Sequence, residues 1–160
     1  LGAVYKQFGG QPLPSLPLKG PYSVHDFARS ARFFGLKCAM PENFPISTQH
    51  AARAHYCLHD QDPALARQVS LALLRAYFVE GRDISQLDTV IDIAAAQGVA
   101  ADTLRAAVGS DEAKAHLKLE CEAAIARGVF GSPFVIIDDE AFWGADRLPQ
   151  IERWLETGGF

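Results

Sequence analysis

The stretch that decides the fold is Gly128-Val-Phe-Gly-Ser-Pro-Phe134, which is followed shortly by Phe142-Trp-Gly-Ala-Asp-Arg147. Phe134-Val-Ile-Ile137 is a short run rich in β-branched residues, Asp138-Asp139 is typical of a turn, and Ala141-Phe-Trp143 fits a returning strand. Proline is tolerated in a sheet only at an edge or at the entry to a strand, where Pro133 stands. This stretch therefore predicts a β-hairpin entered through a proline.

The chain before this hairpin is predicted to be helical from about residue 23 to residue 127. Polar caps and glycine stops divide it into about six helices. The expected N-caps are Ser23, Ser47, Asp62, Ser85, Asp102 and Ser110. Residues 1–22 are rich in glycine and proline, so only a short helical turn, Ala3 to Phe8, is expected there. A last helix, from Arg147 to about Glu156, is expected to follow the hairpin with Asp146 as its cap.

Composition excludes several classes of function. The 160 residues suit one domain, and 49% hydrophobic with 21% charged residues favours a globular protein. A net charge of −4 gives no basic surface for nucleic acid or for an anionic membrane. Because the chain has neither an apolar run of about 20 residues nor a signal-peptide pattern, we expect no membrane segment and a cytoplasmic location.

The cysteines and histidines do not predict redox or metal chemistry. Cys38, Cys57 and Cys121 are far apart and outside any Cys-x-x-Cys pattern, which argues against a disulfide framework and a dithiol oxidoreductase. We expect each to be a small buried hydrophobic residue. His55 and His59 have a spacing that could place two imidazoles on one metal ion, but no third ligand is evident, so no metal site is predicted.

Two parts of the hairpin region could bind a ligand. If Ser132-Pro133 is cis, the backbone of Ser132 faces outward and can pair with an extended peptide-like ligand; if it is trans, the proline merely starts a strand. Trp143-Gly-Ala-Asp146 precedes a helix, whose free N–H groups suit a carboxylate, although Asp146 could simply cap that helix. Elsewhere, Arg53 and Arg75 could reach a substrate carboxylate or form surface salt bridges.

The stretches 128–135 and 142–148 resemble the C-terminal signature of the 2-hydroxychromene-2-carboxylate isomerases. These enzymes are relatives of the kappa-class glutathione transferases within the DsbA-like thioredoxin superfamily. The similarity covers essentially the whole chain, with further matches at residues 17–22 and 77–84 and a weaker one at residues 1–6. The resemblance implies an α/β, thioredoxin-like fold interrupted by a large all-helical insertion. The implied domains are 1–16 (end of the N-terminal half and linker), 17–128 (insertion) and 129–160 (C-terminal half).

The resemblance also implies a ligand and its contacts. Glutathione is the expected ligand, held by Ser132, Pro133, Trp143, Gly144, Ala145, Asp146 and Arg147. Tyr5, Lys6 and Ser47 are the implied contacts of a small aromatic carboxylate substrate. The chain departs from the family at Gly9-Gly10 and at Ser47, where the family has Gly-Asn and Asn. The family's first strand, first helix and second strand, with its catalytic serine, would lie before Leu1, so no residue of this chain is expected to fill the serine's role.

The implied activity is glutathione-dependent interconversion of 2-hydroxychromene-2-carboxylate and trans-o-hydroxybenzylidenepyruvate in the breakdown of naphthalene-type aromatic compounds. One alternative is a kappa-like glutathione transferase or peroxidase. Another is a non-catalytic glutathione-binding fragment. A homodimer is expected because family members are commonly dimeric and because an isolated hairpin leaves unpaired strand edges.

Overall fold

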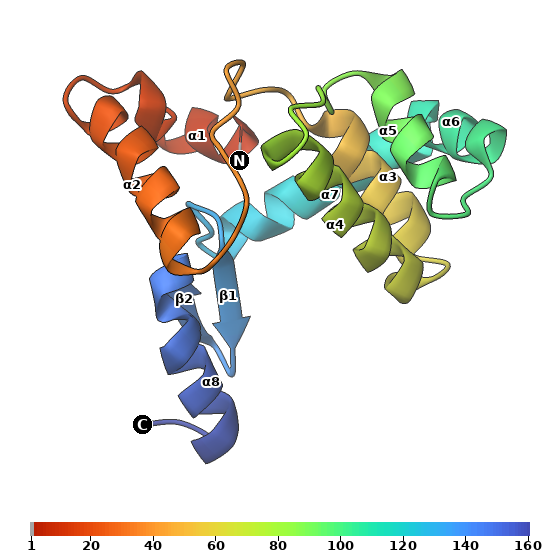
Figure 1. Cartoon of the computed structure of the whole chain (residues 1–160). Helices are drawn as coiled ribbons and strands as arrows, with labels where there is room; N and C mark the ends of the chain where they lie inside the picture. The colour runs from red at the N-terminus through yellow and green to blue at the C-terminus, as the bar shows by residue number, and fades with distance from the viewer. Residues whose placement is uncertain (1) are drawn as a thin grey trace. The chain divides into compact units, whose positions relative to one another are not determined.

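The computed structural model describes residues 2–160, apart from the side chain of Phe8, so Leu1 of the N-terminal resemblance lies outside it. Its elements, in chain order, are α1 (Gly2–Phe8), η1 (Leu13–Ser15), α2 (Lys19–Phe33), α3 (Gln49–His59), α4 (Pro63–Phe78), α5 (Leu87–Ala95), α6 (Ala101–Gly109), α7 (Asp111–Ala126), β1 (Phe134–Ile137), β2 (Glu140–Trp143), η2 (Ala145–Arg147) and α8 (Leu148–Thr157) (Figure 1). They form two compact units. The hairpin unit comprises the chain up to Gly10 with Cys121–Phe160, and the helical unit comprises Gln11–Glu120.

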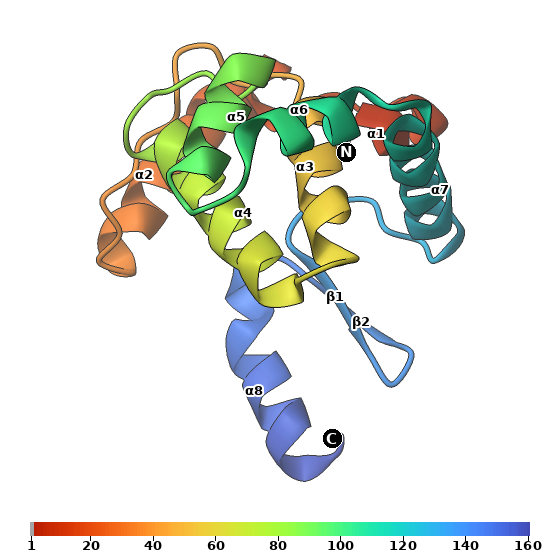
Figure 2. The ribbon, with the colours of Figure 1, turned by 90° about the vertical axis from the view of Figure 1, so that its right-hand side faces the viewer.

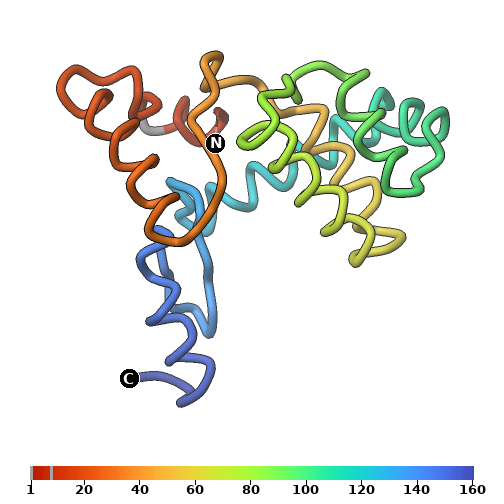
Figure 3. Tube along the Cα trace, viewed as in Figure 1, coloured from red at the N-terminus to blue at the C-terminus, as the bar shows by residue number. Residues whose placement is uncertain are grey.

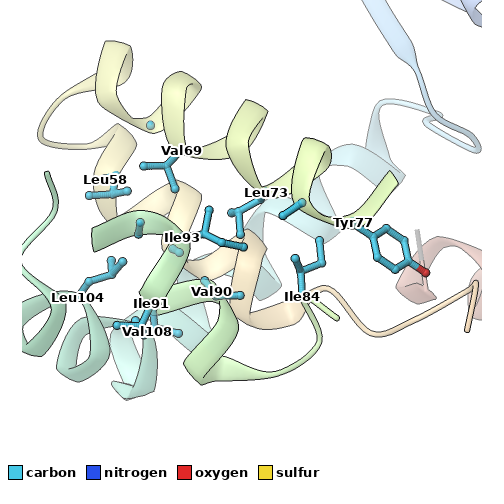
Figure 4. Packing of buried hydrophobic residues seen from close by; sticks show 14 residues of the cluster. Leu58, Val69, Leu73, Tyr77, Ile84, Val90, Ile91, Ile93, Leu104 and Val108 are labelled. Atoms are coloured by element: carbon cyan, nitrogen blue, oxygen red, sulfur yellow. The ribbon is translucent and has the colours of Figure 1, made fainter. Parts of the chain in front are cut away.

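The core of the helical unit lies among α3, α4, α5 and α6. Its largest fully buried side chains are Val69, Val90, Ile91 and Val108 (Figure 4). Helices α3 and α4 form an antiparallel pair joined by a tight turn, which can be followed along the trace in Figure 3. The buried residues of these helices recur at helical spacing, with Ala54 and Leu58 on α3 and Val69, Leu73 and Ala76 on α4.

Two of the expected N-caps are confirmed. Asp62 accepts hydrogen bonds from the backbone N–H groups of Ala64 and Leu65, both at 3.0 Å. Ser110 Oγ accepts one from the N–H of Ala113 at 3.1 Å. Each bond satisfies an N–H group that has no partner inside its helix.

Four of the expected N-caps are wrong. Helix α2 begins at Lys19, so Ser23 lies inside it and donates to the carbonyl of Gly20 at 2.8 Å. The positions before α3, α5 and α6 are held by Thr48, Gln86 and Ala100, without a side-chain cap. The expected caps Ser47, Ser85 and Asp102 are therefore displaced by one or two residues. The starts of these helices follow tertiary packing more than local capping signals.

The hairpin unit contains an antiparallel pair of strands with Phe134 opposite Trp143 and Ile137 opposite Glu140 (Figure 2). Asp138 and Asp139 form the predicted turn in left-handed conformations, with φ of 50° and 66°. Strand β2 begins at Glu140, one residue earlier than expected.

Helix α8 packs on this hairpin. The rings of Phe142 and Trp154 lie 5.8 Å apart, and Trp154 Nε1 donates to Asp138 at 3.2 Å. Phe142 and Ile151 are buried beside them. None of the helices within residues 2–160 is both long and apolar enough to cross a bilayer.

We expect Asp62→Ala to lower the free energy of unfolding by about 1 kcal/mol, because two N–H groups of α4 lose their acceptor. Chemical denaturation followed by circular dichroism measures this change. Asp102→Ala is the matched control, since Asp102 stands in the first turn of α6 without acting as its N-cap. Equal losses in the two variants would contradict the capping role of Asp62.

Candidate functional site

The loop before β1 is tied to the turn after β2. The Ser132-Pro133 peptide is cis, and the N–H of Gly144 donates to the carbonyl of Pro133 at 3.0 Å. Within residues 2–160, the N–H and C=O of Ser132 make no hydrogen bond. Of the two alternatives left open by the sequence, the structure has the cis form, with a free donor and acceptor on the residue before the proline.

The indole of Trp143 is half exposed, with 52% of the residue accessible. It lies over Gly131, where an added Cβ would meet Trp143 Nε1 and would lie 2.8 Å from Cδ1. Its other neighbour is Phe130, edge-on at 4.8 Å. Sequence reasoning did not assign a role to Gly131 or Phe130, although both stand inside the quoted stretch; a glycine two residues before a proline was the available signal.

The segment after Trp143 differs from the prediction. A single turn of 3-10 helix, Ala145–Arg147, precedes α8, which begins at Leu148 rather than Arg147. Asp146 therefore does not cap α8, because the extra turn moves the start of the helix away from its carboxylate. That carboxylate instead lies against Gly144, whose φ is 107°, and accepts a hydrogen bond from Arg147 Nη1 at 2.8 Å.

The same segment offers donors to a ligand. Within the described chain, the N–H groups of Ala145 and Asp146 have no hydrogen-bond partner, as is usual at the start of a helical turn. Arg147 also lines a cavity of about 220 Å³. The other residues around this cavity are Glu140, Ala141, Phe142, Gln150, Trp154 and Phe160. Opposite charges and free N–H groups thus lie side by side, which suits a ligand carrying both charges.

The remaining candidates lie on other elements. Tyr5, half-buried, and Lys6, exposed, lie on α1, and neither takes part in the contacts just described. Ser47 belongs to the helical unit, two residues before α3. On α3, His55 Nδ1 lies 2.8 Å from Ser70 Oγ, and partial burial, with a smaller effect of Asp60, raises the pKa of the Cys57 thiol. A thiol held protonated in this way is a poor nucleophile.

The hairpin is entered through a proline and packs on a C-terminal helix. In the sequence, the helical unit lies between the two parts of the hairpin unit. This arrangement defines a thioredoxin-like protein with a helical insertion. The model of the DSBA-like thioredoxin domain matches residues 1–156, so the chain belongs to that family. This confirms the α/β fold class predicted from the sequence, in a chain that is mostly helical over its described residues.

Its relatives include enzymes of two kinds. The chain is 30% identical over 130 residues to 2-hydroxychromene-2-carboxylate isomerase of Sphingobium xenophagum, covering 81% of this chain and 65% of that protein. It is 27% identical over 158 residues to glutathione S-transferase kappa 2 of Caenorhabditis elegans, covering 91% and 70%. A solved structure of 2-hydroxychromene-2-carboxylate isomerase superposes with a TM-score of 0.83 at 24% identity, over 97% of this chain and 75% of that one.

We expect Gly131→Ala to displace the indole of Trp143 and to lower the free energy of unfolding by about 1–3 kcal/mol, the usual cost of overpacking. Tryptophan fluorescence reports the displacement and thermal unfolding reports the loss. Gly109→Ala is the control, because a Cβ at Gly109 meets nothing within 4 Å. An unchanged emission spectrum in Gly131→Ala would contradict the packing of Trp143 on Gly131.

Proposed function

We propose that this chain binds glutathione and belongs to a glutathione-dependent isomerase that interconverts 2-hydroxychromene-2-carboxylate and trans-o-hydroxybenzylidenepyruvate. The observation that carries the proposal is the free backbone of Ser132 beside a cis proline, which the hydrogen bond from Gly144 to Pro133 ties to the donors and charges of Ala145–Arg147. The relatives support it, since they are an isomerase of this name and kappa glutathione transferases. The substrate and its place in aromatic catabolism are part of the proposal.

Each polar group of glutathione has a proposed partner among these residues. The N–H and C=O of Ser132 would pair with the cysteinyl residue of the tripeptide, as an added strand would. Asp146 would attract the γ-glutamyl ammonium group. The free N–H groups of Ala145 and Asp146, together with Arg147, would attract its carboxylate. Glycine at 144 leaves room for the Asp146 carboxylate, which a Cβ at that position would strike.

The chain's own residues would position reactants and shield them. When bound, glutathione supplies a thiolate that adds reversibly to an unsaturated substrate. The exposed indole of Trp143 would cover the tripeptide and exclude water from one side of it. Lys6, with Tyr5 and Ser47, would contact the aromatic carboxylate substrate.

A kappa-type glutathione transferase or peroxidase is the second candidate, and the kappa transferases among the relatives favour it. Transfer leaves the tripeptide attached to the product, whereas isomerisation returns it unchanged.

We also propose a homodimer in solution and a cytoplasmic location.

We expect the protein to interconvert the two substrate isomers only when glutathione is present, with no net consumption of the tripeptide. Absorbance of the substrate and a thiol assay on the same sample measure the two quantities. Isomerisation at an undiminished rate without glutathione would contradict the mechanism. Stoichiometric loss of thiol with a conjugated product would instead identify a transferase.

We expect Asp146→Ala to weaken glutathione binding about tenfold, because the ammonium group loses a charge-assisted hydrogen bond. Isothermal titration calorimetry measures the affinity. The melting temperature should change little, since Asp146 caps no helix and its pair with Arg147 is exposed. Glu152→Ala, which removes an exposed carboxylate of α8, is the control. Equal affinity in Asp146→Ala and the control would remove Asp146 from the site.

A further inference from the structure

Three buried side-chain polar atoms in the described chain have no hydrogen-bond partner: Nδ1 of His50, Nε of Arg53 and the hydroxyl oxygen of Tyr77. All three belong to the helical unit, the first two on α3 and the third on α4. A buried polar group without a partner lowers stability, and such groups are uncommon in folded proteins. Their occurrence on one pair of helices calls for a ligand or a shared structural reason.

The three groups lie toward the same end of the α3–α4 pair. The contact between His55 Nδ1 and Ser70 Oγ, at 2.8 Å, fixes the register of the two antiparallel helices. From that contact, His50 lies about 8 Å back along α3 and Tyr77 about 10 Å forward along α4, at 1.5 Å per residue. In an antiparallel pair these are the same direction. Arg53 lies between His50 and the contact, one turn from His50.

His50 and Tyr77 lie on the packed faces of their helices. His50 precedes Ala54 and Leu58 at intervals of four residues, and both of those are buried in the core, so His50 continues the core-facing row of α3. Tyr77 is only 3% exposed. Figure 4 shows its ring at the end of the labelled core residues, with the hydroxyl pointing away from them. Burial, more than the nearby Asp83, raises the pKa of Tyr77, so its hydroxyl keeps its proton at neutral pH.

All three groups can donate a hydrogen bond. Arg53 Nη2 lies 3.5 Å from Gln49 Oε1, and no carboxylate of the described residues pairs with this guanidinium. Arg53 can only donate hydrogen bonds, the hydroxyl of Tyr77 has a proton to give, and the imidazole of His50 can carry its proton on Nδ1. Three donors and a fixed positive charge suit an anion, and the planar guanidinium suits a carboxylate in particular.

We propose that His50, Arg53 and Tyr77 form a recognition site for the carboxylate of a small aromatic acid, at one end of the α3–α4 pair. The carboxylate follows from the donors alone. Its assignment to the substrate of the isomerase rests on the proposed function, which it deepens by naming the groups that select an acid.

The test uses salicylate as the probe and salicylamide as its uncharged analogue, titrated into the protein by calorimetry without glutathione. Salicylate should bind saturably and salicylamide should not. Arg53→Gln should weaken salicylate about tenfold through the lost charge-assisted bond. Arg75→Gln is the matched control, because Arg75 lies near the same end of α4 but is exposed and paired with Glu80 at 3.6 Å. Equal binding of both probes, or equal affinities in both variants, would overturn the proposal.

Tyr77→Phe separates a ligand contact from a structural one. Because the free hydroxyl has no partner, its removal should leave the melting temperature unchanged or higher while weakening salicylate. A lower melting temperature with unchanged salicylate affinity would assign the hydroxyl to the fold and overturn its place in the site. If Arg53→Gln does not give the native circular dichroism spectrum, Arg53→Lys, which keeps the charge but loses the planar fork, replaces it and should also weaken salicylate.

The outcome is independent of glutathione binding. Asp146→Ala should keep its affinity for salicylate, since Asp146 belongs to the hairpin unit. Salicylate binding in a protein that fails to bind glutathione would retain the carboxylate site and reject the proposed function. The opposite result would reject the site and retain the function.

Discussion

The hydrogen bond from the N–H of Gly144 to the carbonyl of Pro133 is the constraint on which the hairpin unit depends. It extends the strand pairing by one step and fixes the cis-proline loop against the turn that leads into α8. The free backbone of Ser132 and the charged pair Asp146 and Arg147 are thereby held on neighbouring segments, although they stand 14 or more positions apart in the sequence. Together with the pairing of β1 and β2, this bond holds the two halves of the candidate site beside each other.

The fold could be predicted where local chemistry is decisive. Asp62 followed by proline specifies a helix start, and Asp138-Asp139 between two apolar runs specifies a hairpin turn. The prediction failed where two local signals compete. Asp146 has the chemistry of an N-cap, but the glycine two positions before it allows a turn of 3-10 helix that carries its carboxylate away from α8.

The candidate site was only partly visible in the sequence for a similar reason. Residues with a polar or charged side chain, such as Ser132, Asp146 and Arg147, can be selected by type and spacing. Gly131 has no side chain, and its importance depends on a tryptophan twelve residues away. The sequence also does not mark His50 and Tyr77 as candidates, because the polar group of a histidine or tyrosine on an apolar face usually finds a hydrogen-bond partner in the core. Only the folded structure shows that their polar atoms lack partners.

The packing of Trp143 over Gly131 links the sizes of two residues. The volume missing at one position is filled by the other, so a change at either would be tolerated only with a compensating change at its neighbour. Among related chains, a larger residue at the glycine position should therefore accompany a smaller one in place of the tryptophan. The shape of this surface of the candidate site would then vary by exchange between these two positions, while the strands beneath it stay the same.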